Sequence, residues 1–455
     1  MMTIDIRSRL DEISARPTRF LAIGFFLLIL AGATLLNLPI ASISGNSVGF
    51  IDALFTSASA VCVTGLIVVN TAAHWTFFGK LVILILIQIG GLGFMTMATL
   101  VALVLGRKIT LKNRLILQEE LNNLTLSGVV KLTKYVLYST FLIEAVGALI
   151  LSFRFVPDFG FWKGIWFAIF HSISAFCNAG FDLIGNSMEG YAGSYLVILT
   201  MSALVVVGGI GFSVFINMAQ IIRTKKRLSR LSLHSKLTLV ITIALLVVGF
   251  VFIYVVEFTN PDTLGAMTGS EKILSAIFQS VVPRTAGFNS IPMGDLRDAT
   301  TFFIIILMFI GGSSGSTAGG VKTTTIGVVF LTVLSYIQGK QDVEIYKRRI
   351  PQQAINKAIT IFMLGLFVCL VSTLLLAISE DATFIDVLFE TVSAYATVGL
   401  SRGITSDLTI FGRLLITGIM FFGRLGPLTI AFALAERTKS RKGIYHLAEE
   451  NINVG

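Results

Sequence analysis

Four triplets that end in glycine recur along the chain, and their main-chain oxygens could bind a cation. Glycine accepts backbone angles that other residues resist, and rings of carbonyl oxygens can replace the hydration shell of a permeating cation. Successive glycines are 115, 107 and 112 residues apart, which indicates four internal repeats. The predicted selectivity-filter residues are Val63, Thr64, Gly65, Asn178, Ala179, Gly180, Thr285, Ala286, Gly287, Thr397, Val398 and Gly399.

A short apolar stretch precedes each triplet. At about 10–13 residues it is too short to span a bilayer and is typical of a re-entrant segment. The C-terminal end of a helix carries about half a negative charge, so four such ends that point at one axis would favour a cation. For a single loop the alternative is an ordinary turn or a packing glycine, but the fourfold recurrence favours a filter. The stretches and their triplets occupy residues 51–66, 164–181, 271–289 and 384–401.

A segment rich in glycine and serine interrupts a later apolar run. Residues 311–320 read GGSSGSTAGG, and each glycine costs a helix about 1 kcal/mol relative to alanine. We therefore expect the helix to unwind there, as a segment that lines a cavity and forms a mobile gate beneath the filter. The alternative is a close helix crossing, because Gly311, Gly315 and Gly319 have the G-x-x-x-G spacing. The predicted gate residues are Gly311, Gly312, Ser313, Ser314, Gly315, Ser316, Thr317, Ala318, Gly319, Gly320, Lys322 and Arg424.

Arg424 lies within an apolar run, where a charged side chain marks a candidate functional residue. Four segments align here without gaps, and the other three have glycine in place of the arginine. The arginine could be an electrostatic barrier to cations below the filter, or it could anchor carbonyls of residues 311–320. The aligned segments are 88–96, 206–214, 309–317 and 421–429, and the three glycines are Gly91, Gly209 and Gly312.

Several other charged residues have open roles. A third possibility for Arg424 is an ion pair with Glu144 or Glu390. Lys322 could steady the 311–320 segment or extend toward the cytoplasm. Arg284 and Arg402 flank the third and fourth triplets, and we expect each to be paired, Arg284 with an acid or with helix carbonyls. The acids of the outer loops could raise the local cation concentration or be ordinary solvated charges; they are Asp52, Asp158, Asp182, Glu189, Asp262, Asp295, Asp298, Asp381 and Asp407.

The composition places these segments in a membrane. Of 455 residues, 55% are hydrophobic and only 13% are charged, whereas about 25% charged residues are usual in soluble proteins. Eight apolar runs match a bilayer core about 30 Å thick. The first run could instead be a cleaved signal peptide, although the repeat pattern continues beyond it. The runs are approximately 19–40, 76–105, 133–155, 194–222, 237–258, 300–336, 355–378 and 408–435.

The distribution of positive charge predicts the orientation. Twenty-five of the 35 Lys and Arg residues lie in alternate connections and at both ends, and such segments are cytoplasmic by the positive-inside rule. We therefore expect a multi-pass protein of the cell membrane with both termini in the cytoplasm. The net charge of +10 is then a topology signal, and no nucleic-acid partner is expected. The basic segments are 1–19, 106–134, 223–236, 337–357 and 436–455.

The predicted fold is an all-α integral membrane protein with four repeats in a pseudo-fourfold arrangement around one pore, as in a potassium channel. Each repeat has a first membrane helix (M1), a pore helix and a second membrane helix (M2), which makes eight transmembrane helices. The predicted divisions are 1–105 for repeat 1 with the N-terminal segment, 106–132 for a cytoplasmic link, 133–222 for repeat 2, 223–236 for a link, 237–336 for repeat 3 with the broken helix, 337–354 for a link, 355–435 for repeat 4 and 436–455 for the tail.

These motifs together resemble the Trk/Ktr/HKT superfamily of cation transporters over nearly the whole chain. The similarity is carried by PRTAGFN, SAYATVGL, IQIGGLGF, GGSSGSTAGG and GRLGPLT, and it is strongest to the membrane subunit of bacterial Ktr potassium-uptake systems. The resemblance implies that the four loop glycines form the filter, that potassium is transported and that 311–320 is an intramembrane gating loop. Glycine at all four positions favours potassium, since serine at the first position is associated with sodium permeation in plant relatives. The loops differ from a single T-V-G-Y-G motif, which leaves the degree of discrimination open.

The resemblance also implies partners. It predicts a homodimer, with the polar tail at the dimer interface, and a cytosolic RCK-type regulatory ring similar to KtrA and KtrC that binds ATP or ADP. The chain has no nucleotide-binding fingerprint in a βαβ context of its own, and no bound organic cofactor is expected. Docking candidates for the ring are the links 111–128, 224–236 and 338–353, which could instead contact anionic lipid.

Two other classes of protein, a secondary transporter and a membrane enzyme, fit the sequence less well. A sodium-coupled or alternating-access secondary transporter also has repeats and broken helices, but usually with inverted repeats and intramembrane acids. A membrane enzyme would need a catalytic cluster, and among the four histidines only His171 lies in a pore-helix segment, without an evident partner. We therefore expect no enzyme activity.

Overall fold

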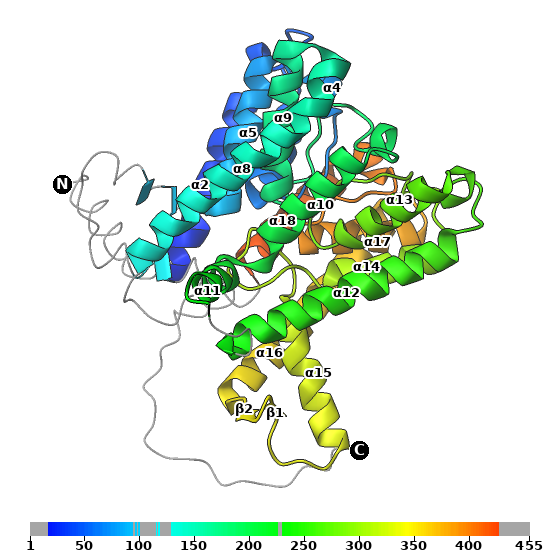
Figure 1. Cartoon of the computed structure of the whole chain (residues 1–455). Helices are drawn as coiled ribbons and strands as arrows, with labels where there is room; N and C mark the ends of the chain where they lie inside the picture. Colours follow the sequence, from blue (N-terminus) through cyan, green and yellow to red (C-terminus); the bar gives the residue numbers. More distant parts are fainter. Residues whose placement is uncertain are drawn as a thin grey trace, which may run out of the picture.

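The computed structural model describes residues 17–93, 96–97, 99–100, 115, 117–118, 129–225 and 230–426. The described chain is almost entirely helical (Figure 1). Its only β-sheet is the two-stranded antiparallel hairpin of β1 (Glu344–Ile345) and β2 (Arg348–Arg349). The predictions for the tail 436–455, for most of the link 106–132 and for the first 16 residues lie outside the described residues.

Four helical units of the same order follow one another along the chain. Each has a long helix, a short helix that ends at a glycine triplet, and a second apolar helix. The units are α2 (Pro17–Leu36), α3 (Phe50–Cys62) and α5 (Phe77–Leu92); α8 (Val129–Phe159), α9 (Phe161–Phe176) and α10 (Tyr195–Ile210); α12 (Leu233–Glu257), α13 (Gly269–Val281) and α14 (Asp298–Phe309); and α16 (Gln352–Ser379), α17 (Phe384–Ala396) and α18 (Ile410–Leu425). The connecting elements are η1 (Pro39–Ala41), α4 (Thr71–His74), η2 (Glu189–Tyr191), α11 (Phe212–Arg223), η4 (Leu264–Ala266), α15 (Thr323–Ile337) and η5 (Ile404–Asp407).

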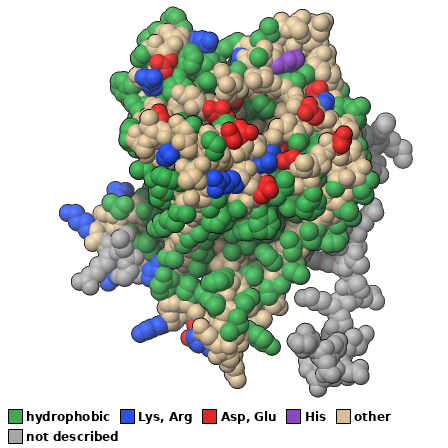
Figure 2. Space-filling model, turned by 90° about the vertical axis from the view of Figure 1, so that its right-hand side faces the viewer, with side chains coloured by type: hydrophobic (Ala, Val, Ile, Leu, Met, Phe, Trp, Pro, Cys, Tyr) green, Lys and Arg blue, Asp and Glu red, His purple; other side chains and the backbone are tan. Residues whose placement is uncertain are grey.

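The first helix of each unit has the length and composition of a membrane span. Within the described residues four helices meet these criteria, and the bent pair α10–α11 would be a fifth. Only 17% of the apolar window in α12 is buried in the protein, and Val247 and Val251 are at least half exposed. A water-exposed surface rarely has such a large apolar area. Figure 2 shows a broad hydrophobic area on one face below a region that carries most of the visible acidic and basic side chains.

The second helices are shorter than the sequence predicted. The apolar runs predicted over 76–105, 194–222 and 408–435 contain α5, α10 and α18, which each end after 16 residues. Each ends at a glycine with positive φ, namely 89° at Gly93, 99° at Gly211 and 84° at Gly426. The chain bends by 100° between α10 and α11. Glycine allows this turn because it has no Cβ, and the last glycine of GGLG, GGIG and GRLG was the sequence signal.

The break predicted in the third unit is present. Helix α14 ends at Phe309 and α15 begins at Thr323. The segment between them is not helical and contains one isolated parallel bridge, between Ile310 and Val321. The G-x-x-x-G alternative is wrong for this segment, because its glycines do not lie on a helix.

Neighbouring units pack in a closed cyclic order. The second helix of each unit contacts the short helix of the next: α5 contacts α9, α10 contacts α13, α14 contacts α17, and α18 contacts α3. The fourth unit therefore packs against the first. This order brings four loops that are far apart in the sequence to the centre of the bundle.

Candidate functional site

The first residue of each triplet is in the left-handed backbone region. The φ angles are 58° at Val63, 61° at Asn178, 73° at Thr285 and 52° at Thr397. The glycine two residues later is also left-handed in every loop, with φ between 71° and 95°. A non-glycine residue with positive φ is uncommon, and most of all when it is β-branched. Because the same angles occur in all four loops, the triplets share one backbone conformation at these positions.

The first and fourth triplets bond through their N–H groups to their own short helices, and all four triplets leave their carbonyls free. Thr64 N–H donates to the Ser59 carbonyl (2.8 Å), and Gly65 N–H donates to Ser59 Oγ (3.0 Å). The same pair of bonds joins Val398 and Gly399 to Ser393. The carbonyl oxygens of all twelve triplet residues accept no hydrogen bond from any described residue. Buried carbonyls without partners are uncommon, and a cation is a ligand that would satisfy them.

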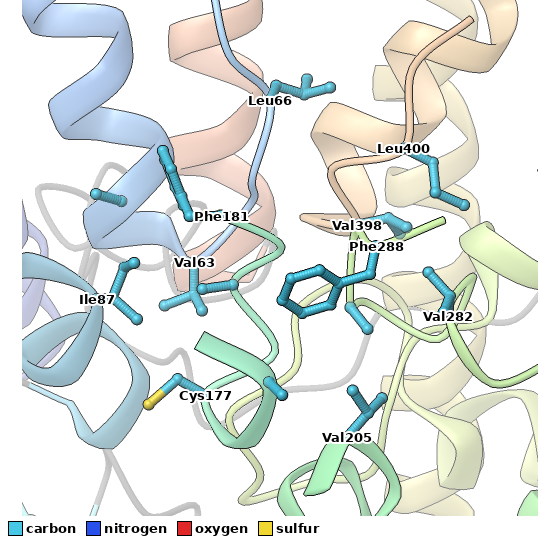
Figure 3. Close-up of a cluster of buried hydrophobic side chains, with 14 of the residues drawn as sticks. Val63, Leu66, Ile87, Cys177, Phe181, Val205, Val282, Phe288, Val398 and Leu400 are labelled. Atoms are coloured by element: carbon cyan, nitrogen blue, oxygen red, sulfur yellow. The ribbon is translucent and has the colours of Figure 1, made fainter. Parts of the chain in front are cut away.

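The four triplet glycines lie against one another in a closed ring. A Cβ placed on Gly65 would be 2.5 Å from the Ala179 carbonyl oxygen, and one on Gly180 would be 2.8 Å from Gly287 Cα. A Cβ on Gly287 would be 2.6 Å from the Val398 carbonyl oxygen, and one on Gly399 would overlap the Thr64 carbonyl oxygen. Figure 3 shows the four loops around this centre, with Val63 and Val398 in the first and fourth triplets and Phe181 and Phe288 directly after the second and third. The close approach of four backbones requires glycine at each position.

A hollow of about 270 Å³ lies beside the first and fourth loops. It is lined by the chain that follows the Gly65 triplet and by the chain that follows the Gly399 triplet, including Ser401 and Thr405. Its lining combines apolar side chains, such as Ile67 and Val68, with hydroxyls and main-chain groups. Gly65 and Gly399 themselves belong to the lining, and no residue of the 311–320 segment does.

The segment 311–320 contacts three of the four units. In the second unit, Ser313 N–H donates to the Gly209 carbonyl (2.9 Å), and the Gly315 carbonyl accepts from Phe212 N–H (2.9 Å). In the fourth unit, Gly319 is so close to Thr397 that a Cβ on the glycine would overlap the threonine hydroxyl. The contact with the first unit is made through Arg424.

The Arg424 guanidinium joins the segment to two helices. It donates hydrogen bonds to the carbonyls of Thr317 in the segment and of Gly90 in α5, and its Nη2 lies 3.2 Å from the Gly91 carbonyl oxygen. Lys322 Nζ donates to the Ala318 carbonyl oxygen at 2.6 Å, so this side chain steadies the segment instead of extending toward the cytoplasm. Of the roles left open by the sequence, the geometry favours anchoring of the segment by Arg424.

The two acids that could have paired with Arg424 have other partners. Glu144 accepts from Gln88 Nε2 at 3.1 Å, and Glu390 accepts from Thr405 Oγ1 at 2.5 Å. Both acids are buried, and their hydrogen bonds reduce the penalty for burying a carboxyl group. The ion-pair alternative for Arg424 has no support in these contacts.

Comparison with known proteins places the chain in a family. The family model described as TrkH, cation transport protein, matches residues 12–442. The chain belongs to the TrkH family of cation transport proteins. This family-level result confirms the resemblance and the expectation that the chain is not an enzyme. With its apolar helices, this TrkH-family chain is a multi-pass membrane protein.

Individual relatives span almost its entire length. This TrkH-family chain is 44% identical over 439 residues to the Ktr system potassium uptake protein B of Bacillus subtilis (strain 168), which covers 96% of this chain and 97% of the relative. It is also 42% identical over 454 residues to the potassium/sodium uptake protein NtpJ of Enterococcus hirae. That match covers 99% of this chain and 98% of the relative. The crystal structure of the potassium transporter TrkH from Vibrio parahaemolyticus matches with a TM-score of 0.70 over 91% of this chain and 83% of that chain, and at 20% identity it shows the fold alone.

The two arginines beside the triplets of this TrkH-family chain differ in their contacts. Arg402 is paired as expected, since its Nε lies 2.5 Å from Asp386 Oδ1 and its Nη1 donates to Thr301 Oγ1 at 2.9 Å. The expectation for Arg284 was wrong: Nη2 donates to the Thr242 hydroxyl at 3.4 Å, and the described residues include no acid in an ion pair with it. Its side chain is buried against α12, a neighbour that local sequence does not reveal.

Replacing Asp386 with Asn is expected to lower the free energy of unfolding by about 1.5–3 kcal/mol, the usual range for hydrogen bonds to charged groups. The reason is that the Arg402 and Asp386 side chains are only 13% and 18% exposed, so little water can replace the pair. The measurement is thermal unfolding of the purified protein. Asp342→Asn is the control, because its pair with Arg349 is 66% and 41% exposed and such pairs contribute about 0–1 kcal/mol. Equal losses in both variants would contradict the prediction.

Several acids of the outer loops make specific contacts in place of open solvation. Asp52 lies 2.6 Å from Arg413, and Asp158 lies 3.1 Å from Arg154. Burial raises the pKa of the Glu189 carboxyl, although the hydrogen bond that Asn289 donates at 2.6 Å opposes this shift. These carboxyls are therefore less free to attract cations than unpaired surface acids.

Some residues that shape the site were missed from the sequence. Serine precedes the triplet glycine by six residues in three of the four loops, at Ser59, Ser174 and Ser393. Two of these hydroxyls accept from the glycine N–H, and Ser174 Oγ donates to the Phe181 carbonyl at 2.8 Å. His171 has partners after all, because Nδ1 bonds to the Phe167 carbonyl (2.7 Å) and Nε2 accepts from Leu183 N–H (3.3 Å). The spacing of the serines was the available signal.

Proposed function

We propose that this chain mediates potassium uptake across the cell membrane, with the four glycine triplets as its selectivity filter. The observation that carries the proposal is the closed ring of four glycines whose loops leave their carbonyl oxygens free. Such oxygens can take the place of water around a cation. Potassium is the proposed ion because the Bacillus subtilis relative is a potassium uptake protein and because all four ring positions are glycine. The carbonyls of residues 63–65, 178–180, 285–287 and 397–399 would bind the ion.

The proposed topology has eight membrane passes in a pseudo-fourfold arrangement around one pore. The cyclic packing of the units supports it, because each second helix meets the next short helix in the same way. In this topology the short second helices α5, α10 and α18 would reach the membrane centre from outside. The concentration of basic residues in alternate connections supports cytoplasmic termini.

The 311–320 segment is the proposed gate. It lies against three units and is held by the Arg424 guanidinium, so it would block the path beneath the filter in the arrangement described here. Its non-helical backbone is compatible with a membrane only if it is buried in protein or lines a cavity. A segment held by a few hydrogen bonds can be displaced when those bonds are lost.

The proposed regulators are cytosolic. The Bacillus subtilis relatives are components of a Ktr system, which supports an RCK-type ring similar to KtrA or KtrC that binds ATP or ADP. The hairpin β1–β2 and the link that carries it are one candidate contact, because Lys347, Arg348 and Arg349 are exposed there. We also propose a homodimer in the membrane.

A second candidate function is transport of sodium together with potassium, or transport coupled to sodium. The specific observation in its favour is that NtpJ, which is 42% identical, is a potassium/sodium uptake protein. An alternating-access mechanism would use the glycine-rich segment as a moving part and not as a gate.

The test is cation flux into liposomes that contain the purified chain. Fast passive flux that favours potassium over sodium, with rubidium in between, is expected for a filter. Deleting Gly315 and Ser316 from the segment is expected to raise this flux several-fold, because the shortened segment cannot reach its partners. Deleting Gly339 and Lys340 from the exposed turn after α15 is the matched control.

Two results would contradict the proposal. Flux that saturates, requires a counter-ion gradient and is abolished by the deletion would mean an alternating-access transporter. Equal passive flux of potassium and sodium through the unmodified chain would refute the potassium filter.

A further inference from the structure

The Asn178 side chain connects the 311–320 segment to two of the glycine triplets. Its Oδ1 accepts a hydrogen bond from Thr317 Oγ1 at 3.1 Å. Its Nδ2 lies 3.3 Å from Thr285 Oγ1 and 3.4 Å from the Arg284 carbonyl oxygen. The side-chain amide of Asn178, in the second triplet, therefore contacts the third triplet on one side and the 311–320 segment on the other.

The three side chains of this connection are closed off from water. Asn178 is 1% exposed, and Thr285 and Thr317 are 0% exposed. A buried amide that loses a partner cannot replace it with solvent, so the loss carries the full desolvation cost. Asn178 is also fixed by its backbone, because asparagine is among the few residues that accept its φ of 61° readily. The amide can respond to a lost partner only by turning or by moving its loop.

Thr317 keeps this contact only while its own part of the segment stays in place. Its carbonyl accepts from Arg424, and its hydroxyl lies 3.3 Å from the Phe176 carbonyl oxygen as well as near Asn178. Displacement of the segment by even one residue length, about 3.8 Å between Cα atoms, breaks the hydroxyl bond. The Asn178 Oδ1 is then unpaired, and the hydrogen bond to Thr285 loses its fixed geometry.

The corresponding position of the fourth triplet lacks this connection. Thr397 occupies the place of Asn178 in its own loop, and its buried hydroxyl has no hydrogen-bond partner among the described residues. Gly319 touches Thr397 only by close packing. The polar link from the segment to the ring therefore acts on the second and third triplets.

We infer that Thr317 and Asn178 are positioning residues that couple the place of the 311–320 segment to the cation selectivity of the ring. The inference rests on the proposed function. While Thr317 keeps its bond to Asn178, the second and third triplets are held at a fixed separation, also when movement of other residues of the segment opens the path; when that bond is lost, the triplets are released and discrimination between potassium and sodium falls. Coupling of this kind is reciprocal, so an ion that fits the ring also favours the bond between Thr317 and Asn178.

The test is the ratio of potassium to sodium flux in liposomes that contain the full chain. Thr317→Val keeps the shape and removes the hydroxyl, and it is expected to lower the ratio at least threefold. Thr317→Ser keeps a hydroxyl and is expected to restore most of the ratio. A purely structural role would instead lower or raise the flux of both cations by the same factor.

A double-mutant cycle shows whether the effect passes through Asn178. Thr285→Val removes the partner on the far side of the amide, and Thr317→Val is expected to add little to it, because the two residues act through one link. Thr317→Val and Thr397→Val are expected to have additive effects on the logarithm of the ratio, because Thr397 is outside the link. If Thr317→Val cannot be purified in folded form, Thr285→Val and Thr285→Ser provide the same comparison from the filter side.

Different outcomes separate this inference from the proposed function. If the unmodified chain favours potassium and Thr317→Val leaves the ratio unchanged, the coupling is refuted and the filter stands. Additive effects of Thr317→Val and Thr285→Val would also refute it. If the unmodified chain passes both cations equally, the proposed filter fails, and the inference fails with it.

Discussion

Replacing Gly180 with Ala is expected to reduce potassium flux by about tenfold or more, the equivalent of at least about 1.4 kcal/mol. A Cβ at this position would lie 2.8 Å from Gly287 Cα and 3.0 Å from the Ala286 carbonyl oxygen. Neither contact can relax by rotation of a side chain, because both involve the backbone of the next loop. The second and third loops must therefore move apart, which changes the ring where the ion would bind. The measurement is potassium and sodium flux in liposomes.

Gly45→Ala is the matched control for this prediction. Gly45 has a φ of 72°, almost equal to the 71° of Gly180, but no atom lies within 4 Å of a Cβ built on it. Both variants share the backbone cost of a left-handed alanine, about 1–2 kcal/mol, and only Gly180→Ala disturbs a neighbouring loop. Similar flux from both variants would show that the close approach of the loops does not matter for transport.

Replacing Arg424 with Gln is expected to raise the potassium flux of the isolated chain by about tenfold or more. The guanidinium donates to the carbonyls of Thr317 and Gly90, and hydrogen bonds to charged groups contribute about 1.5–3 kcal/mol each. Glutamine is shorter and neutral, so it cannot hold both carbonyls. The segment is then displaced more often, and the flux rises.

Arg413→Gln is the control on the same helix. Arg413 also caps carbonyls, of Leu408 and Ser406, and it pairs with Asp52 at 2.6 Å, but it lies at the opposite end of α18. This variant is expected to lower thermal stability without an increase in flux. A rise in flux in both variants would mean that general loosening of α18, and not release of the segment, opens the path.

The local features of the site could be predicted from the sequence. The triplets, the short helices before them and the unwound segment at 311–320 all depend on residues that are near one another in the chain. Glycine content and the length of apolar runs act locally, so helices and helix breaks can be predicted from them without knowledge of the tertiary structure. The fourfold recurrence added the information that the four loops belong to one arrangement.

The early ends of α5, α10 and α18 could not be predicted with the same reasoning. A single glycine inside an apolar helix is usually tolerated, so GGLG and GGIG were consistent with continuous helices. At Gly211 the turn lets Phe212 N–H donate to the Gly315 carbonyl in the segment of the next unit. That partner is more than 100 positions away in the sequence, and only the folded chain brings it close.

For the charged residues, too, the sequence determines one part of the result and the tertiary structure another. The sequence by itself determined that Arg424 is exceptional, because the other repeats have glycine at its position, but it left barrier, anchor and ion pair open. The tertiary structure favours the anchor, since it places the Thr317 and Gly90 carbonyls within reach and gives Glu144 and Glu390 other partners. Composition determines which segments of the chain can be non-helical, and the repeats show where the glycine loops recur. Which donor meets which acceptor depends on how the units pack, and that packing is a property of the whole chain.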